Sequence, residues 1–236
     1  MNTIDVIILA GGMGTRLKPV ISDRPKLLAP VGNRPFLLIL LDQISRAGFN
    51  RVILCTGHMA DQVEAEFGAE YNGLSLIYSR EEIPLGTGGA LRNAFPLISS
   101  ETIMVMNGDS FVDTDLNLFL QCFVAKSYDA AIVLKKMNNA SRYGLVDVDA
   151  NGLITTFQEK NTKSGSGWIN AGVYLFKKTV IETIPQGRSV SIEREFFSFL
   201  VGRELYGYCS EGKFIDIGLP ESYAAAEEFF RELYKR

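Results

Sequence analysis

Residues 4–17 read Ile-Asp-Val-Ile-Ile-Leu-Ala-Gly-Gly-Met-Gly-Thr-Arg-Leu, a compact apolar run that ends in three glycines. An apolar run of this kind predicts a buried parallel strand over Ile4–Ala10. Gly11, Gly12 and Gly14 follow directly, and glycine allows a sharp turn and a close approach of the backbone to a ligand. Because the exposed N–H groups of such a turn bind phosphate oxygens, the stretch predicts a phosphate-binding loop in an α/β fold.

Two cations follow the glycine loop. Arg16 offers a planar fork of donors and Lys26 a point charge, and both suit phosphate oxygens. The loop is not a Walker A motif, because no Gly-Lys-Ser/Thr follows, and its glycine spacing excludes a dinucleotide-dependent oxidoreductase. The alternative is a tight turn with surface cations, which the glycines alone fit equally well. The added Thr15-Arg16-Leu17 and Pro25-Lys26 favour the phosphate site.

Alternating strand and helix patterns fill the first half of the chain and indicate βαβ units with a parallel sheet. After the first strand we expect strands at Arg51–Cys55, Leu74–Tyr78 and Thr102–Met106, and helices at Phe36–Ala47, Met59–Phe67, Gly88–Leu97 and Asp115–Lys126, the last capped by Asp115. Beyond residue 129 we expect strands at Ala130–Lys136, Leu145–Asp149, Leu153–Glu159, Ile169–Phe176 and Lys213–Ile217, and helices near Ser191–Val201 and from Glu221 onward. Tyr223, Ala226, Phe230 and Leu233 share one face of the last helix. No linker or repeat interrupts this order, which favours one domain over residues 1–236.

Composition and charge exclude several classes of protein. The chain has 236 residues, of which 47% are hydrophobic and 22% charged, as expected of a folded globule. Its net charge is −3 and its Lys and Arg residues form no stripe, so we expect no nucleic-acid partner. No segment approaches the roughly 20 apolar residues of a membrane span, and no signal-peptide pattern begins the chain. We therefore expect no membrane association and a cytoplasmic location.

The three cysteines, Cys55, Cys122 and Cys209, are far apart and have no zinc-ligand spacing. We interpret them as buried thiols in a reducing compartment. The single histidine, His58, lies in a Thr-Gly-His-Met turn and is expected to have no catalytic role. Trp168 is expected to pack rather than to stack on a ligand.

The segment Leu9–Leu17, with Arg24-Pro25-Lys26 and Pro30-Val31 after it, resembles the signature of the sugar nucleotidyltransferases, and the resemblance continues through most of the chain. It implies a Rossmann-like fold whose mixed, mainly parallel central sheet is flanked by helices. It also implies a nucleotide-binding half over residues 1–128 and a sugar-phosphate-binding half over residues 129–236. The implied reaction transfers a nucleoside monophosphate from a nucleoside triphosphate to a sugar 1-phosphate and releases pyrophosphate.

The resemblance assigns the nucleotide side of the site to two segments. Pro84–Ala90 resembles the segment that lies against the nucleobase, so Gly86 and Thr87 would contact the base, although a plain loop before a helix is the alternative. Arg16 and Lys26 would be catalytic as well as nucleotide-binding. The other implied nucleotide-binding residues are Leu9, Ala10, Gly11, Gly12, Gly14 and Thr15.

Two carboxylates resemble the magnesium ligands of the family. Asp109 follows the predicted strand Thr102–Met106, and ligands of open α/β sheets bind at this end of the strands. Asp216 lies in Phe214–Tyr223, which resembles the Asp-Ile-Gly-Thr-Pro segment of the family. Two such groups converging on one hard cation suit Mg²⁺ and phosphate chemistry. The alternative for Asp109 is a capping role, which we also expect of Asp113 and Asp115.

The sugar side is implied by three further segments. Tyr143-Gly144 and Glu159-Lys160 resemble elements that contact the sugar, with Lys160 a catalytic residue that binds the sugar phosphate. Asn170 and Gly172 resemble an Asn-x-Gly segment that faces the sugar. A solvated pair at a strand end is the alternative for Glu159 and Lys160.

Some stretches resemble the heptose-1-phosphate guanylyltransferases within the family: Val20–Lys26, Arg34–Phe36, Pro84–Ala90, Ser141–Gly144 and Ser191–Glu195. They imply GTP and a heptose 1-phosphate as substrates and a GDP-heptose for a surface polysaccharide as product. A mannose-1-phosphate guanylyltransferase, an amino-sugar-1-phosphate uridylyltransferase and a nucleotide-binding regulatory subunit stay open as alternatives. Glu81 or Glu82 could accept hydrogen bonds from guanine, but the sequence places neither. The oligomeric state is also open, a homodimer included.

Overall fold

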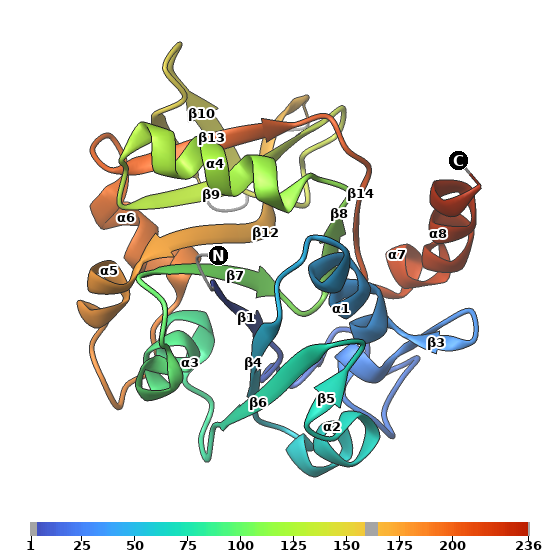
Figure 1. Cartoon of the computed structure of the whole chain (residues 1–236). Helices are drawn as coiled ribbons and strands as arrows, with labels where there is room; N and C mark the ends of the chain where they lie inside the picture. The colour runs from blue at the N-terminus through green and yellow to red at the C-terminus, as the bar shows by residue number, and fades with distance from the viewer. Residues whose placement is uncertain (1–3, 159–164, 236) are drawn as a thin grey trace.

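The structure is a computed structural model and describes residues 4–158 and 165–235. Within them a ten-stranded sheet has the order β11-β10-β12-β7-β1-β4-β6-β5, with β9 joined to β12 and β13 joined to β9 (Figure 1). The four strands β7, β1, β4 and β6 pair in parallel, whereas β12 is antiparallel to β7, β9 and β10. The mixed, mainly parallel sheet flanked by helices in a single domain is thereby confirmed.

The strands of the large sheet are β1 (Asp5–Leu9), β4 (Arg51–Thr56), β5 (Glu70–Tyr71), β6 (Leu74–Arg80), β7 (Thr102–Asn107), β9 (Ala130–Met137), β10 (Leu145–Val148), β11 (Ile154–Gln158), β12 (Gly167–Lys177) and β13 (Leu205–Ser210). Two small antiparallel pairs are β2 (Pro30–Val31) with β3 (Arg34–Pro35), and β8 (Ser110–Val112) with β14 (Phe214–Asp216). The helices are α1 (Phe36–Arg46), α2 (Ala60–Phe67), α3 (Gly86–Asn93), α4 (Leu116–Lys126), α5 (Lys178–Glu182), α6 (Phe197–Leu200), α7 (Pro220–Ala224) and α8 (Ala226–Tyr234). Short 3-10 helices cover η1 (Lys26–Leu28) and η2 (Phe95–Leu97), and η3 (Ile192–Phe196) is a π-helix.

Helices cover both faces of the sheet. The side chains of β1 alternate between the two faces, and each face carries its own hydrophobic cluster. Val6 and Ile8 point to the face covered by α1, α4 and α8, where Phe36 and Phe230 are buried. Ile7 points to the opposite face, which α3, α5 and α6 cover. The strand is buried on both faces, as its apolar run predicted, because helices on both sides remove its side chains from water.

The carboxyl ends of β1 and β7 are held side by side, and they bring distant segments of the chain together. The amide of Gly108 donates to the carbonyl of Leu9 at 2.9 Å. The amide of Ile217 donates to the carbonyl of Asp109 at 2.8 Å, directly after Asp216, the last residue of β14, pairs with Ser110 of β8. Residues near positions 10, 108 and 217 therefore meet at one end of the sheet.

Three predicted helices differ from the structure. The segment predicted as Gly88–Leu97 begins at Gly86 and ends at Asn93, because Pro96 follows within the separate 3-10 turn η2. The segment predicted near Ser191–Val201 is the π-helix η3 followed by the short α6. The final helix is divided at Ala225 into α7 and α8; Tyr223 is only half-buried and donates its hydroxyl to the carbonyl of Pro30.

The other strand and helix positions agree with the predictions to within about two residues. Asp115 caps α4 as predicted, since its carboxylate accepts from the amides of Asn117 and Leu118. The sequence did not predict β8, β13, α5 or the two-residue strands β2, β3 and β5. Leu205–Ser210 contains a glycine and little apolar periodicity, and it becomes a strand because β9 offers a free edge.

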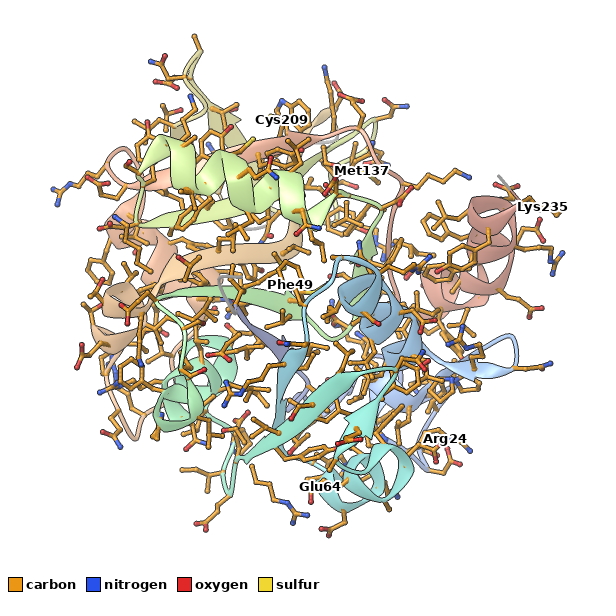
Figure 2. The ribbon with its side chains drawn as sticks, viewed as in Figure 1. Arg24, Phe49, Glu64, Met137, Cys209 and Lys235 are labelled. Atoms are coloured by element: carbon orange, nitrogen blue, oxygen red, sulfur yellow. The ribbon has the colours of Figure 1, made fainter. Side chains whose placement is uncertain are left out.

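The interpretation of the cysteines as buried thiols is correct only for Cys55. Cys122 is half-buried, and Cys209 is exposed near the end of β13, where the strand pairs with β9 (Figure 2). Burial raises the pKa of the Cys55 thiol far above its usual range.

In the part of the chain that the structure describes, no helix is both long and apolar enough to cross a bilayer.

Candidate active site

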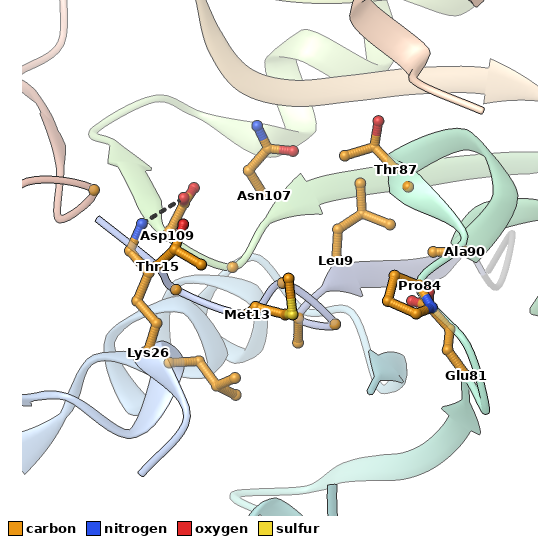
Figure 3. A pocket seen from close by; sticks show the side chains of 18 of the residues that line it. Leu9, Met13, Thr15, Lys26, Glu81, Pro84, Thr87, Ala90, Asn107 and Asp109 are labelled. Atoms are coloured by element: carbon orange, nitrogen blue, oxygen red, sulfur yellow. Dashed lines mark hydrogen bonds and ion pairs between the residues drawn. The ribbon is translucent and has the colours of Figure 1, made fainter. Parts of the chain in front are cut away.

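Two adjoining clefts open at the carboxyl ends of β1 and β7. The first cleft, of about 480 Å³, is lined by the glycine loop, Lys26, Glu81, Gly86, Thr87 and Asp109 (Figure 3). The second cleft, of about 780 Å³, is lined by Arg142, Tyr143, Gly144, Asn170, Gly172 and Asp216. Both clefts share Arg16, Gly86, Thr87, Asn107, Asp109, Glu193 and Gly218, so they form one continuous depression.

The glycine loop forms the floor of the first cleft. All the residues predicted there (Leu9, Ala10, Gly11, Gly12, Gly14, Thr15, Arg16 and Lys26) line it, together with Met13. Gly14 has φ +58°, a backbone conformation that other residues rarely adopt. A Cβ at Gly11 would clash with Glu81 Oε1, so a larger residue there would displace that carboxylate from its place over the loop.

The predicted cations converge on one point with both predicted metal ligands. Lys26 Nζ lies 2.6 Å from Asp109 Oδ2 (Figure 3). A Cβ at Gly218 would lie 2.9 Å from Asp216 Oδ1, 3.3 Å from Lys26 Nζ and 3.9 Å from Arg16 Nη2. The glycine therefore keeps open the space where two cations and a carboxylate meet. Asp216 pairs with Ser110, the residue after Asp109, and the amide of the next residue, Ile217, donates to the Asp109 carbonyl, so the two aspartates lie at the same end of the β8–β14 pair.

Asp216 is held by several donors. Its Oδ1 accepts from the amide of Gly218 at 3.0 Å. Its Oδ2 accepts from the Tyr143 hydroxyl and lies 3.6 Å from Arg142 Nη2. Burial, and after it the hydrogen bond to Asp216, raises the pKa of Tyr143 above its usual range, so this phenol stays a donor.

The donor set at this point fits a magnesium ion. Mg²⁺ is commonly bound by one or two carboxylates, with waters and substrate phosphates completing six oxygen ligands. Asp109 and Asp216 both line the second cleft and supply two such oxygen donors. Over residues 4–158 and 165–235 no group of three or more His, Cys, Asp or Glu side chains could hold a metal by itself. Waters and substrate phosphates would supply the remaining oxygen ligands of an ion held here.

Gly86 and Thr87, the predicted base contacts, begin α3 at the rim of both clefts. Gly86 has φ +69°, and a Cβ there would lie 2.6 Å from the carbonyl of Val190. Thr87 Oγ1 donates to Glu193 Oε2 at 2.8 Å and accepts from the amide of Ile192 at 2.8 Å. The hydroxyl of Thr87 is thus engaged by η3, which the sequence did not predict.

Glu81, which the sequence could not place, lies in the wall of the first cleft (Figure 3). Its Oε2 accepts from the amide of Leu85 at 2.8 Å, and its Oε1 lies over Gly11. Burial raises the pKa of Glu81 above its ordinary value, and the hydrogen bond from Leu85 partly offsets that rise. Glu82 is exposed and lines neither cleft.

The sugar-side residues are brought together in the second cleft as far as the structure describes them. Gly144, Asn170 and Gly172 line it. Asn170 Oδ1 accepts from the amide of Gly172 at 2.8 Å, and Gly172 has φ +77° in a register shift of β12 between Asn170 and Tyr174. Glu159 and Lys160 lie outside the described residues.

Several cleft residues were not singled out from the sequence: Asn107, Ser110, Phe157 and Glu193. Asn107 directly follows the predicted strand Thr102–Met106 and stands two residues before Asp109, so its place at the strand end was a usable signal. Glu193 belongs to the Ser191–Glu195 stretch, but only the fold shows that it faces both clefts.

Trp168 packs on the hydrophobic cluster beneath α3 and α6, as expected. His58 borders a separate small hollow beside Gly12.

Comparison with known proteins agrees with this geometry. The model of the family described as nucleotidyl transferase matches residues 5–232. The chain is 36% identical over 226 residues to the D-glycero-alpha-D-manno-heptose 1-phosphate guanylyltransferase of Aneurinibacillus thermoaerophilus, covering 95% of this chain and 97% of that protein. It is 38% identical over 226 residues to the mannose-1-phosphate guanylyltransferase of Mycobacterium tuberculosis, covering 94% of this chain and 63% of that protein.

A solved structure is similar over the whole chain. The crystal structure of HddC from Yersinia pseudotuberculosis complexed with GMP-PN superposes with a TM-score of 0.86 and 34% sequence identity. The match covers 97% of this chain and 100% of that one. The similarity therefore includes both clefts and the sheet that carries them.

Proposed function

The chain belongs to the nucleotidyl transferase family and is a sugar-1-phosphate nucleotidyltransferase, and we propose that it transfers GMP from GTP to a heptose 1-phosphate. The observation that carries this proposal is the single depression in which Arg16, Lys26 and two carboxylates meet between two clefts. The first cleft would take the nucleotide and the second the sugar phosphate. A regulatory subunit would not need these reactive cations and carboxylates.

Guanine as the base is supported by Glu81. Guanine presents two neighbouring donors, N1–H and the exocyclic amine, and a carboxylate can accept from both. Glu81 Oε1 lies over the glycine loop inside the first cleft, where a base would be enclosed. Adenine, uracil and cytosine offer no such pair of donors, so this carboxylate favours GTP.

The reaction needs no general base from the protein. The second pKa of a phosphate monoester is about 6, so the sugar phosphate is already a nucleophilic anion near pH 7. It would attack the α-phosphorus in line and expel pyrophosphate. The obstacle is repulsion between two anionic phosphates, which positioned cations relieve.

The residues of this chain divide that task. Arg16 would neutralise the leaving pyrophosphate, Lys26 would hold the reacting phosphates, and Lys160 would anchor the sugar phosphate. Asp109 and Asp216 would hold a Mg²⁺ ion, which supplies Lewis-acid neutralisation of phosphate charge when bound. Gly144, Asn170 and Gly172 would face the sugar.

A heptose is favoured by the similarity to the guanylyltransferase of Aneurinibacillus thermoaerophilus, and the product would then be a GDP-heptose for a surface polysaccharide. Mannose 1-phosphate is the second candidate, because the identity to the mycobacterial mannose-1-phosphate enzyme is comparable. The two candidates share the nucleotide and differ only in the occupant of the second cleft.

A pyrophosphate-release panel tests the proposal. Four nucleoside triphosphates are combined with heptose, mannose, glucose and amino-sugar 1-phosphates in the presence of Mg²⁺. We expect release with GTP and the heptose 1-phosphate. A preference for mannose 1-phosphate would replace the heptose, and equal release with every base, or none with any, would overturn the guanylyl assignment.

A further inference from the structure

Glu193 lies on the wall that the two clefts share. It belongs to η3, a π-helix, and π-helical turns occur frequently at functional sites. A carboxylate only accepts hydrogen bonds when ionised, so its donors fix the direction of every bond around it. Glu193 joins Thr87, the proposed base contact on the shared rim, through Tyr174 to Asn170 of the second cleft.

Glu193 Oε2 accepts two hydroxyl protons, one from Thr87 on the rim that both clefts share and one from Ser191 of the second cleft. Thr87 Oγ1 lies 2.8 Å away and Ser191 Oγ lies 2.9 Å away. The lone pairs of Thr87 are available to the amide of Ile192, which donates at 2.8 Å, so the proton of Thr87 points to Glu193. The start of α3 is thereby fixed to η3 through the Thr87 side chain, and to the segment before η3 through the Gly88 amide, which donates to the carbonyl of Val190.

On the side of the second cleft, Glu193 Oε1 lies 3.4 Å from the Tyr174 hydroxyl. Tyr174 is fully buried, and its oxygen accepts from Asn170 Nδ2 at 2.9 Å and from Asn107 Nδ2 at 3.2 Å. Because both lone pairs are used, its proton is left for Glu193. Burial raises the pKa of Tyr174 well above its ordinary value, so the phenol keeps that proton.

These contacts form a continuous path from Thr87 through Glu193 and Tyr174 to Asn170, which in turn holds Gly172. We propose that Glu193 is a positioning residue that couples the two clefts, so that a nucleotide in the first cleft raises the affinity of the second for the sugar 1-phosphate. This inference rests on the proposed function. The physical reason is that a ligand which orders Thr87 also orders Asn170, so the second ligand loses less conformational freedom.

Linkage makes the coupling reciprocal, so it can be measured from the nucleotide side. Calorimetry gives the Kd of a GTP analogue with a methylene bridge between its α and β phosphates, which cannot undergo transfer. The titration is done in Mg²⁺ with and without saturating D-glycero-α-D-manno-heptose 1-phosphate. For the wild-type protein we expect the sugar phosphate to lower the Kd by at least about 5-fold, the lower end of common coupling factors.

Glu193→Gln tests the path at its centre. The amide oxygen of the variant can still accept from Thr87 and Ser191. Its amide nitrogen then faces the Tyr174 hydroxyl, and because both groups are donors, that hydrogen bond is lost. We expect the Kd ratio to fall to about 1 in this variant. Tyr174→Phe removes the same link from its other end and should give the same ratio, with no further loss in the double variant. Glu195→Gln is the matched control, because Glu195 caps Ser191 and pairs with Arg188 but lines neither cleft.

The outcomes separate the two claims. The coupling role would be overturned if Glu193→Gln or Tyr174→Phe kept the Kd ratio of the wild-type protein. It would also be overturned if the two ligands bound the wild-type protein independently. Both results would leave the proposed function intact. A wild-type protein that binds neither the GTP analogue nor the sugar phosphate would overturn both. A merely structural role for Glu193 would lower the melting temperature and leave the Kd ratio unchanged, which also counts against the proposal.

Discussion

The ammonium group of Lys26 lies 2.6 Å from Oδ2 of Asp109, and this ion pair joins the start of η1 to the segment after β7, 83 positions apart in the sequence. The Lys26 side chain is 13% exposed and the Asp109 side chain 42%, so the pair is partly shielded from water. Such shielding strengthens the interaction of a cation with anions that enter the cleft. Each partner holds the other in place before a substrate arrives.

Replacement of Lys26 by methionine should lower kcat by about 10²–10³-fold, the usual effect of losing one preorganised group that stabilises charge in a transition state. Pyrophosphate release under saturating substrates measures this loss. Lys18→Met is the control, because Lys18 is an exposed lysine of the same segment that lines neither of the two clefts. Activity within twofold of wild type in Lys26→Met would contradict the role assigned to it.

Arg16→Ala should reduce turnover strongly while the fold stays intact. Arg16 is exposed in the cleft, and substitutions at exposed positions usually change the free energy of unfolding by no more than about 0.5 kcal/mol. Urea unfolding and pyrophosphate release on the same preparation separate the two effects. Arg203→Ala, at an exposed turn away from the clefts, should change neither quantity. Unchanged turnover in Arg16→Ala would remove the phosphate role of the loop.

Glu81→Gln should lower kcat/KM for GTP by about 30-fold, because hydrogen bonds to a charged group contribute about 2 kcal/mol and the amide presents a donor to the guanine donors. The rate with the other nucleoside triphosphates should change little, so the measurement is the ratio of kcat/KM values across the four bases. Glu82→Gln is a matched neighbour that is exposed outside the cleft. A base ratio that is the same in Glu81→Gln and Glu82→Gln would show that Glu81 does not select guanine.

Asp5 should make stability depend on pH in the acid range. Burial alone would raise the pKa of Asp5, but hydrogen bonds from the Ser100 and Ser99 amides and from Arg51 outweigh it and lower this pKa. A carboxyl group whose pKa is lowered by folding stabilises the protein above its unfolded pKa of about 4, and that contribution is lost as pH falls through the folded pKa.

Asp5→Asn should therefore lower the free energy of unfolding at pH 7 by about 2 kcal/mol, and the difference from wild type should shrink below pH 4. Urea unfolding at pH 7 and at pH 3 measures both values. Asp147→Asn, an exposed carboxylate of β10, serves as the control. A constant difference at the two pH values would argue against the lowered pKa.

Much of the fold and part of the site follow from local sequence. The apolar run before Gly11 predicts β1 and the loop, because a strand end and a glycine turn are set by neighbouring residues. Asp115 predicts its own helix cap for the same reason. The Thr87–Glu193 hydrogen bond joins residues 106 positions apart, so no local sequence pattern predicts it. The same holds for β13, whose pairing with β9 depends on the finished sheet.

The roles of Glu159 and Lys160 stay predictions, because both residues lie outside the described part of the chain. The division of labour between residues 1–128 and 129–236, and a homodimer, are predictions too. The cleft residues nevertheless come from both halves, since Glu193 and Gly218 line the first cleft beside the glycine loop.

The register shift in β12 limits how the chain length can change. Before the shift Asn170 pairs with Leu134 of β9, and after it Tyr174 pairs with Ile132 on one side and Val105 on the other. Side chains alternate between the faces of a strand, so deleting one residue between 170 and 174 would turn every later side chain of β12 to the opposite face. The buried tyrosine would then leave its amide partners. Residues 170–174 should therefore not tolerate insertions or deletions. Surface loops beside a cleft ordinarily do tolerate them.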